Sequence, residues 1–246
     1  MKTSEAKYYR VQFGPPGSRG FAGEGWSAVA IILITCVILY LLGVARTELG
    51  IRLALVPRLF WHGYLWQPIT YQFLHAGFLH LALNSLVLWS FGPELEHRWG
   101  RAKFLRFFLI SGAGGGIASA LGYMGSQFPV VGMSGSIFGL LAAYALLDPN
   151  RIVLLFFFPV RIRDLVIWSL GIGIFAELFT SGRGIAHWAH VGGAVTGYLY
   201  MKKDDLFRRS RNWYYRKKLE RRRRADGVIE NEAPAEPAEP VEHETH

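Results

Sequence analysis

The sequence lacks charge over most of its length. Only 18% of its residues are charged, while 51% are hydrophobic and 15% are aromatic. Ordinary soluble domains carry about 25% charged residues, and here most of the charges lie near the two ends of the chain. This profile is typical of a polytopic membrane protein and argues against a soluble enzyme built around one core.

Cysteine is almost absent as well. The single cysteine, Cys36, lies within an apolar run. One cysteine cannot form an intramolecular disulfide, and this position also disfavours a role as a thiol nucleophile.

Apolar stretches predict an all-α fold with six membrane-spanning helices. The first stretch, 26–44, contains no charged residue and is long enough to cross about 30 Å of hydrocarbon. Small residues in several stretches, as at 111–122, would let helices approach closely within lipid. The predicted spans are 26–44, 78–95, 103–124, 133–147, 164–179 and 185–201.

The distribution of basic residues predicts the orientation of these spans. With six spans, both termini lie on one side, together with the 96–106 and 148–163 connections. That side carries every Lys and Arg except Arg46, Arg52, Arg58 and Arg183. The positive-inside rule therefore predicts cytoplasmic termini, with the other connections (45–74, 125–132 and 180–184) facing outward.

Composition divides the chain into three predicted parts. Residues 1–25 form a cytoplasmic N-terminal segment, residues 26–201 the six-span domain, and residues 202–246 a cytoplasmic tail. The basic first half of the tail is expected to contact anionic lipid rather than nucleic acid, and the acidic second half to be disordered. Without a transit peptide or a large appended domain, a bacterial plasma membrane is the expected location.

Polar residues inside spans are costly and mark candidate functional sites. Three stretches supply them, HAGFLHLALN at 75–84, GMSG at 132–135 and AHWAHVGGAVTG at 186–197. Each opens a predicted span at its outer end, so their polar groups converge at one depth, as a water-filled site in the membrane requires. The residues concerned are Ser134, His80, Asn84 and His190.

Helical spacing sorts these residues by face. His80 and Asn84 are four residues apart and share a face, whereas His75 falls on another. The last stretch forms a ridge of small residues that lets a second helix come close. The ridge consists of His190, Gly193 and Gly197, and its expected partner is the helix that begins at Ser134 and Gly135.

Elimination narrows the chemistry of this site. No Lys lies between Lys103 and Lys202, so Ser134 has no lysine base, and no H-E-x-x-H zinc motif is present. Asp148 and Asp164 fall at inner span ends, which disfavours a two-aspartate mechanism. A serine nucleophile with a histidine base remains, at a helix start whose free amides suit a developing oxyanion.

At these residues the chain resembles the rhomboid family of intramembrane serine proteases. The resemblance rests on H-x4-H-x3-N at 75–84, G-x-S-G at 132–135 and A-H-V-G-G-x3-G at 189–197, in that order. The segment GPELEHRWG at 92–100 is similar to the one that closes the family's second span. The resemblance extends from about residue 26 to residue 201.

The resemblance implies a role for each site residue. Ser134 would be the nucleophile and His190 the base, while His80, Asn84 and the Ser134 amide would form the oxyanion hole. Supporting positions would be His75, Phe138, Gly132, Gly135, Gly193 and Gly197.

Two positions depart from the family's pattern. Phe138 stands where many members have a tyrosine that stacks on the catalytic histidine; it can stack but cannot donate a hydrogen bond. Trp66 and Gln67 stand where many members have Trp and Arg, in the first outer connection.

The implied reaction is peptide-bond hydrolysis through an acyl-enzyme, without a metal or other cofactor. The implied partners are membrane lipids and single-pass membrane proteins, which would be cut near the outer face. Two alternatives remain open. One is a catalytically silent rhomboid-like protein that binds membrane clients; the other is a metal site built from His75, His80, His187 and His190.

Overall fold

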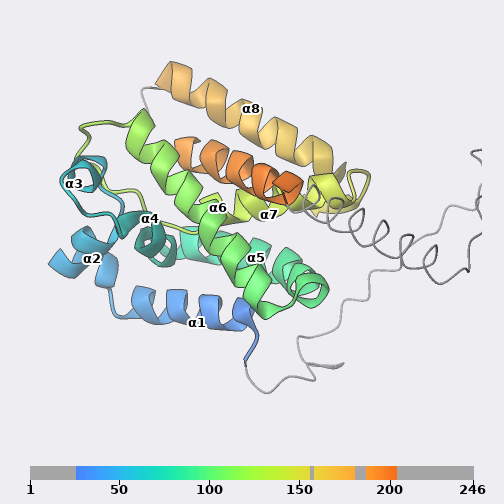
Figure 1. Cartoon of the computed structure of the whole chain (residues 1–246), viewed down its shortest axis with the longest axis horizontal. Helices are drawn as coiled ribbons and strands as arrows, with labels where there is room; N and C mark the ends of the chain where they lie inside the picture. The colour runs from blue at the N-terminus through green and yellow to red at the C-terminus, as the bar shows by residue number, and fades with distance from the viewer. Residues whose placement is uncertain (1–25, 156–157, 181–186, 204–246) are drawn as a thin grey trace, which may run out of the picture. The chain divides into compact units, whose positions relative to one another are not determined.

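The computed structural model describes residues 26–155, 158–180 and 187–203 (Figure 1). The chain divides into two units, Met1–Tyr200 and Met201–His246. The predicted N-terminal segment and nearly all of the predicted tail lie outside the described residues. So does most of the outward connection predicted at 180–184.

Long helices stand at every predicted span. They are α1 (Ala28–Leu41), α5 (Phe78–Trp99), α6 (Arg101–Gly122), α7 (Ser134–Leu147), α8 (Ile162–Thr180) and an unlabelled helix over 187–203. Among the described residues, α6 alone is long and apolar enough to cross a membrane by itself; α1 and α7 are shorter apolar helices. A further pair, Gln67–Phe73 with α5, passes this test jointly but is bent by 97°. The count of six spans therefore stays a prediction.

The connection between α1 and α5 is folded rather than loose. It contains η1 (Val44–Arg46), α2 (Glu48–Leu53), α3 (Pro57–Trp61), α4 (Gln67–Thr70) and η2 (Tyr71–Phe73). The buried Gln67 side chain accepts a hydrogen bond from the Val56 amide at 3.1 Å. The Trp61 indole donates to the Ala120 carbonyl at 3.0 Å, which ties the connection to α6.

The described residues are mostly helical, as the sequence predicts, but a short β hairpin stands in the connection between α7 and α8. Strands β1 (Ile152–Leu155) and β2 (Phe158–Arg161) pair there as an antiparallel hairpin. Both are rich in β-branched and aromatic residues, which favour extended backbone. The registry pairs Ile152 with Arg161 and Leu155 with Phe158.

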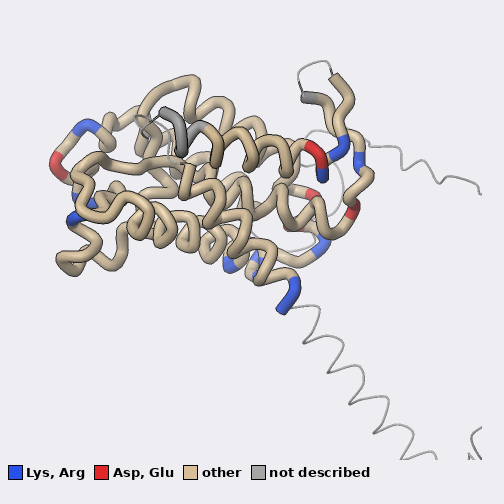
Figure 2. Tube along the Cα trace, turned by 90° about the horizontal axis from the view of Figure 1, so that it is seen from above, with Lys and Arg blue, Asp and Glu red and all other residues tan. Residues whose placement is uncertain are grey.

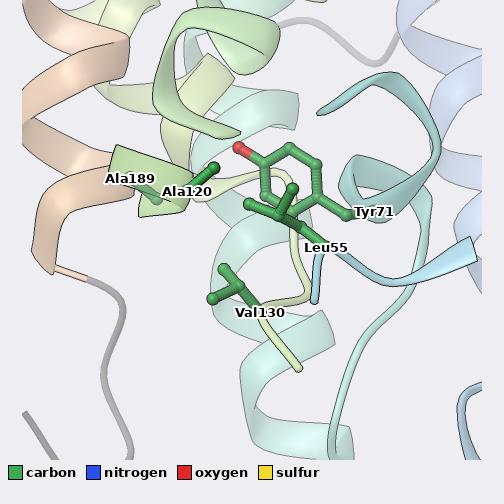
Figure 3. Close-up of a cluster of buried hydrophobic side chains, with 5 residues drawn as sticks. All are labelled: Leu55, Tyr71, Ala120, Val130 and Ala189. Carbon is green, nitrogen blue, oxygen red and sulfur yellow. The ribbon is translucent and has the colours of Figure 1, made fainter. Parts of the chain in front are cut away.

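One buried cluster joins elements that are distant in sequence. It consists of Leu55, Tyr71, Ala120, Val130 and Ala189 (Figure 3). The Tyr71 hydroxyl donates to the Gly112 carbonyl at 2.8 Å. Leu55 and Val130 also pair through two backbone hydrogen bonds of 3.0 and 2.8 Å. The cluster therefore ties the α1–α5 connection to the segment that leads into α7.

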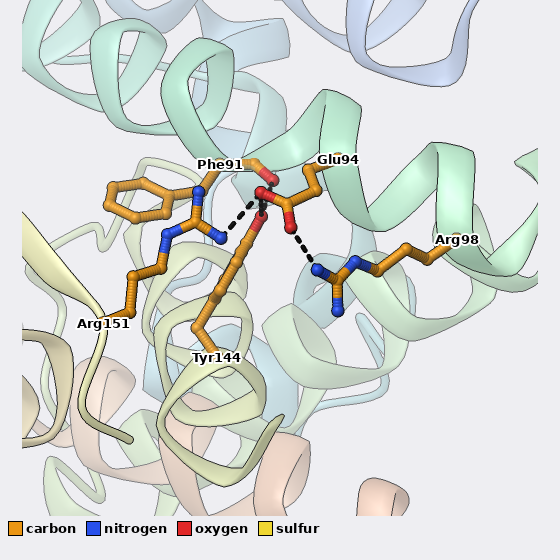
Figure 4. A network of polar contacts seen from close by, with 5 residues as sticks. All are labelled: Phe91, Glu94, Arg98, Tyr144 and Arg151. Carbon is orange, nitrogen blue, oxygen red and sulfur yellow. Dashed lines mark hydrogen bonds and ion pairs between the residues drawn. The ribbon is translucent and has the colours of Figure 1, made fainter. Parts of the chain in front are cut away.

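Charged residues gather at two opposite ends of the helices. Figure 2 shows this clearly, with an uncharged stretch between the two ends of the described helices. One end holds Arg46, Glu48, Arg52 and Arg58; the other holds the ends of α5, α7 and the hairpin. At that second end Glu94 forms ion pairs with Arg98 and Arg151 and accepts a hydrogen bond from the Tyr144 hydroxyl (Figure 4).

A buried carboxylate joins α1 to α5. Glu96 is 2% exposed, and its two oxygens accept from the Ala28 and Val29 amides at 2.6 and 3.1 Å. These amides lie in the first turn of α1 and have no partner within that helix, so Glu96 caps the N-terminus of α1 although it is far away in sequence. Its negative charge also interacts favourably with the positive end of the helix dipole.

Candidate active site

Ser134 is the first residue of α7, and the segment before it is held by backbone contacts. The Gly132 amide donates to the Tyr71 carbonyl at 3.0 Å, and Met133 is fully buried. Gly132 has a φ of +114°, a conformation that residues with a side chain rarely adopt. The glycine therefore turns the chain so that α7 begins with the serine.

The His190 ring lies beside the Ser134 hydroxyl. Its Nε2 is 2.9 Å from Ser134 Oγ, within hydrogen-bonding distance, although the two residues come from different helices. The Phe138 ring lies one turn after Ser134 and stacks on His190, with centroids 4.5 Å apart and planes inclined by 15°. The serine and the predicted base are thus adjacent, and an aromatic ring supports the base.

Glycines allow the helices carrying these two residues to come so close. A Cβ atom on Gly193 would collide with the Gly135 carbonyl. One on Gly197 would lie 2.7 Å from Gly139 Cα. The ridge expected from the sequence does pack against α7.

His80 and Asn84 face the same backbone turn from α5. A Cβ atom on Gly132 would lie 2.7 Å from His80 Nε2 and 3.8 Å from Asn84 Nδ2. Asn84 is buried and donates one N–H to the His80 carbonyl at 2.9 Å. Its side-chain amide has a second N–H, so a donor remains for a ligand near the start of α7.

Two further histidines flank this group. His75 is 2% exposed, and its ring lies 5.1 Å from the His80 ring. His187 is buried, with its ring 6.3 Å from and nearly perpendicular to that of His190. A Cβ atom on Gly173 of α8 would lie 3.3 Å from His187 Nδ1, so His187 fills the space between α8 and the 187–203 helix.

Sequence reasoning missed a second buried polar contact beneath the serine. The Ser136 hydroxyl donates to Gln72 Oε1 at 2.8 Å, and both residues are fully buried. Gln72 Nε2 donates in turn to the Pro68 and Leu109 carbonyls at 2.9 and 3.3 Å. A glutamine close to an apolar span was the available signal, because such groups need a partner in a membrane.

The histidines do not converge on one point. Within the described ranges, no group of three or more His, Cys, Asp or Glu side chains is placed so that it could hold a metal ion. The geometry there brings together a hydroxyl, an imidazole and amide donors, the groups that acyl transfer uses.

The sequence profile of the Rhomboid domain matches residues 62–203, more than half of the chain. The chain belongs to the rhomboid family. Rhomboid proteins are integral membrane proteins with a helical fold, and the family includes intramembrane proteases.

Individual rhomboid relatives each match part of this chain. Rhomboid protease GluP of Bacillus subtilis is 36% identical over 138 residues, which are 55% of this chain and 25% of GluP. Rhomboid protein 1 of yeast mitochondria (Saccharomyces cerevisiae) is 31% identical over 162 residues, 61% of this chain and 42% of the relative. RHOMBOID-like protein 4 of Arabidopsis thaliana is 33% identical over 141 residues, 54% of this chain and 32% of the relative. The chain therefore spans less than half of each of these relatives.

Proposed function

We propose that this rhomboid chain is an intramembrane serine endopeptidase with Ser134 as nucleophile and His190 as general base. The observation that carries the proposal is the 2.9 Å separation of Ser134 Oγ and His190 Nε2 at the start of α7. A serine hydroxyl is a weak nucleophile until a base within hydrogen-bonding distance accepts its proton. The protease names of relatives such as GluP point in the same direction.

Each step of acyl transfer has a candidate group in this arrangement. For Nε2 to accept the Ser134 proton, His190 must carry its own proton on Nδ1, with Phe138 stacked on the ring. Oγ then attacks the substrate carbonyl, and the imidazolium returns the proton to the leaving amine. Water, activated by the same imidazole, hydrolyses the acyl-enzyme and regenerates Ser134.

The oxyanion formed by this attack would be held by three donors. They are the Ser134 amide at the positive end of α7, the free N–H of Asn84 and the His80 ring. Support comes from the position of both α5 side chains against Gly132, two residues before the nucleophile.

The proposed substrates are single-pass membrane proteins, cleaved near the outer face of the membrane. Ser134 follows the 125–132 segment, which bonds to the α1–α5 connection that carries Arg46, Arg52 and Arg58. The opposite end carries more basic residues, so the positive-inside rule puts that end, and both termini, in the cytoplasm. A bound helix must unwind locally, because a helix hides its carbonyls from the nucleophile.

Labelling with a fluorophosphonate probe would test the pair of residues directly. Detergent-solubilised wild type is compared with the Ser134→Ala, His190→Ala and His187→Ala variants. We expect the first two substitutions to abolish labelling and the third to preserve it. If His187→Ala abolished labelling and His190→Ala did not, the base would be His187 and not His190. A folded wild type that never labels would favour the silent, client-binding alternative.

A further inference from the structure

The β1–β2 hairpin carries apolar side chains that the described part of the chain leaves uncovered. Ile152, Leu154 and Phe158 are 66%, 71% and 73% exposed. Residues directly opposite one another share a face of the ladder, so Leu154 lies beside the exposed Pro159. Two strands alone are marginally stable in water, and an exposed apolar face makes them less so.

The base of the hairpin is basic and fixed to the helices. Arg151 directly precedes β1, and its Nη1 is 2.7 Å from Glu94 Oε2. The same guanidinium lies over the Tyr144 ring, 5.0 Å from its centroid (Figure 4). The Ile162 amide donates to the Arg151 carbonyl at 2.8 Å. These contacts tie the hairpin to α5, α7 and α8.

The position of the hairpin indicates what covers it. It leaves the charged end where α7 stops and α8 starts, and Figure 2 shows it projecting sideways from that end instead of beyond it. Since rhomboid proteins are integral membrane proteins, this end of the helices lies at a membrane surface. A hairpin that runs sideways there stays at the level of the lipid headgroups.

The charge pattern fits the same surface. Arg161, at the end of β2, is exposed and stands opposite Ile152 in the ladder. Arg163 follows at the start of α8, half-exposed and 3.1 Å from Asp164. Leu154 and Phe158 near the turn, with Arg161 beside Ile152 at the base, form an amphipathic element of the kind that enters the interface of an anionic leaflet.

We propose that the β1–β2 hairpin is a membrane-surface anchor. Leu154 and Phe158, which lie near the turn on opposite faces of the ladder, insert among the acyl chains just below the headgroups, and Arg161 at the base contacts the phosphates of anionic phospholipids. The proposal concerns how the cytoplasmic end sits on its membrane and does not depend on protease activity. The competing occupants are a second copy of the chain or another protein.

Environment-sensitive labels on the full-length protein would test this anchor. Leu154→Cys and Phe158→Cys are labelled with a nitrobenzoxadiazole dye and reconstituted at one copy per nanodisc of phosphatidylcholine and phosphatidylglycerol. Asp148→Cys, exposed at the end of α7, is the matched control. The native Cys36 is buried, so it should react little with the dye. Wild type treated with the same dye checks that the label enters only at the introduced cysteines.

For the two hairpin sites we expect blue-shifted emission and at least about twofold stronger quenching by doxyl-labelled lipid than at residue 148. Equal quenching at all three sites would overturn the proposal. Blue-shifted emission without lipid quenching would also overturn it, because protein would then cover the hairpin.

The headgroup contact has its own test. Replacing phosphatidylglycerol with phosphatidylcholine should weaken quenching at residue 154, and Arg161→Gln should remove this dependence on lipid charge. If the protein that retains Arg161 showed equal quenching at residue 154 with and without phosphatidylglycerol, the assignment of an anionic lipid would be overturned.

Discussion

At the scale of single residues, glycine at position 132 is required for two separate reasons. Its φ of +114° strains any residue with a side chain. A Cβ atom there would also lie 2.7 Å from the His80 ring. Gly125, in the same connection, has a φ of +82° but no atom near its Cβ position. The two glycines therefore separate backbone strain from the contact with His80.

Gly132→Ala should abolish activity, whereas Gly125→Ala should retain it. Both variants bear a backbone cost of about 1–2 kcal/mol, but only Gly132→Ala displaces His80 from the proposed oxyanion hole. Cleavage rates and thermal unfolding of the two purified variants check this. Equal activities of the two variants would mean that His80 has no role at the site.

Phe138 should affect the chemical step through its contact with His190. Stacked ring pairs contribute about 0.5–1.5 kcal/mol, so Phe138→Ala should lower kcat by roughly 2- to 10-fold. Phe138→Tyr keeps the ring and should stay near the wild-type rate. Steady-state kinetics separate kcat from KM for each variant. A Phe138→Ala enzyme with wild-type kcat would show that the stacked ring does not orient the base.

At the scale of elements, close packing of the 187–203 helix on α7 brings His190 to Ser134. Gly193 and Gly197 stand against Gly135 and Gly139, so backbone meets backbone with no side chain between. Such contacts suit helices in lipid, where no hydrophobic driving force brings helices together and small residues allow close van der Waals packing of the backbones. A larger side chain at this contact would push the two helices apart and separate His190 from Ser134.

Gly193→Ala should destabilise the protein and abolish fluorophosphonate labelling. The added methyl group collides with the Gly135 carbonyl, and overpacking of this kind costs about 1–3 kcal/mol. Gly171→Ala in α8 is the matched control, because nothing lies within 4 Å of its Cβ position. Thermal unfolding and probe labelling are measured on both. A labelled, fully stable Gly193→Ala protein would contradict the packing.

The sequence predicted those elements whose residues repeat with a helical period. The ridge from His190 to Gly197 and the shared face of His80 and Asn84 follow from spacing alone. The contacts of Gln67 and Gln72 could not be predicted this way. Apart from the Ser136 hydroxyl, which contacts Gln72, their partners are main-chain carbonyls and amides, and such partners leave no trace in side-chain identity.

The hairpin was missed for a different reason. The run from Ile152 to Arg161 is short and apolar, and such runs have no period that separates strand from helix or loop. Asp148 and Pro149 mark the end of α7, but nothing in the sequence shows that the chain pairs with itself afterwards. The anchoring of Arg151 by Glu94 joins positions that are far apart in sequence.

At the scale of the whole molecule, the uncharged band between the two charged ends should define the part in lipid. Ile110 lies mid-way along α6 and is 44% exposed; Met124, just after α6, is 66% exposed. A lysine at the first position would face hydrocarbon. At the second it could reach the headgroup region.

Ile110→Lys should therefore reduce stable membrane insertion, at a cost of about 2.5–3.5 kcal/mol, while Met124→Lys should cost much less. The yield of protein that resists extraction from membranes by alkaline carbonate checks this. Equal insertion of the two variants would place residue 110 outside the hydrocarbon.

Proteolysis itself is tested most directly by cleavage in a membrane. Full-length wild type and Ser134→Ala are reconstituted into liposomes with a single-pass membrane protein whose helix contains helix-breaking residues near its outer end. The account predicts that wild type cuts within or beside that helix, with the cleaved bond located by intact mass, and that Ser134→Ala leaves the substrate whole. Cleavage that survives in Ser134→Ala would contradict the account.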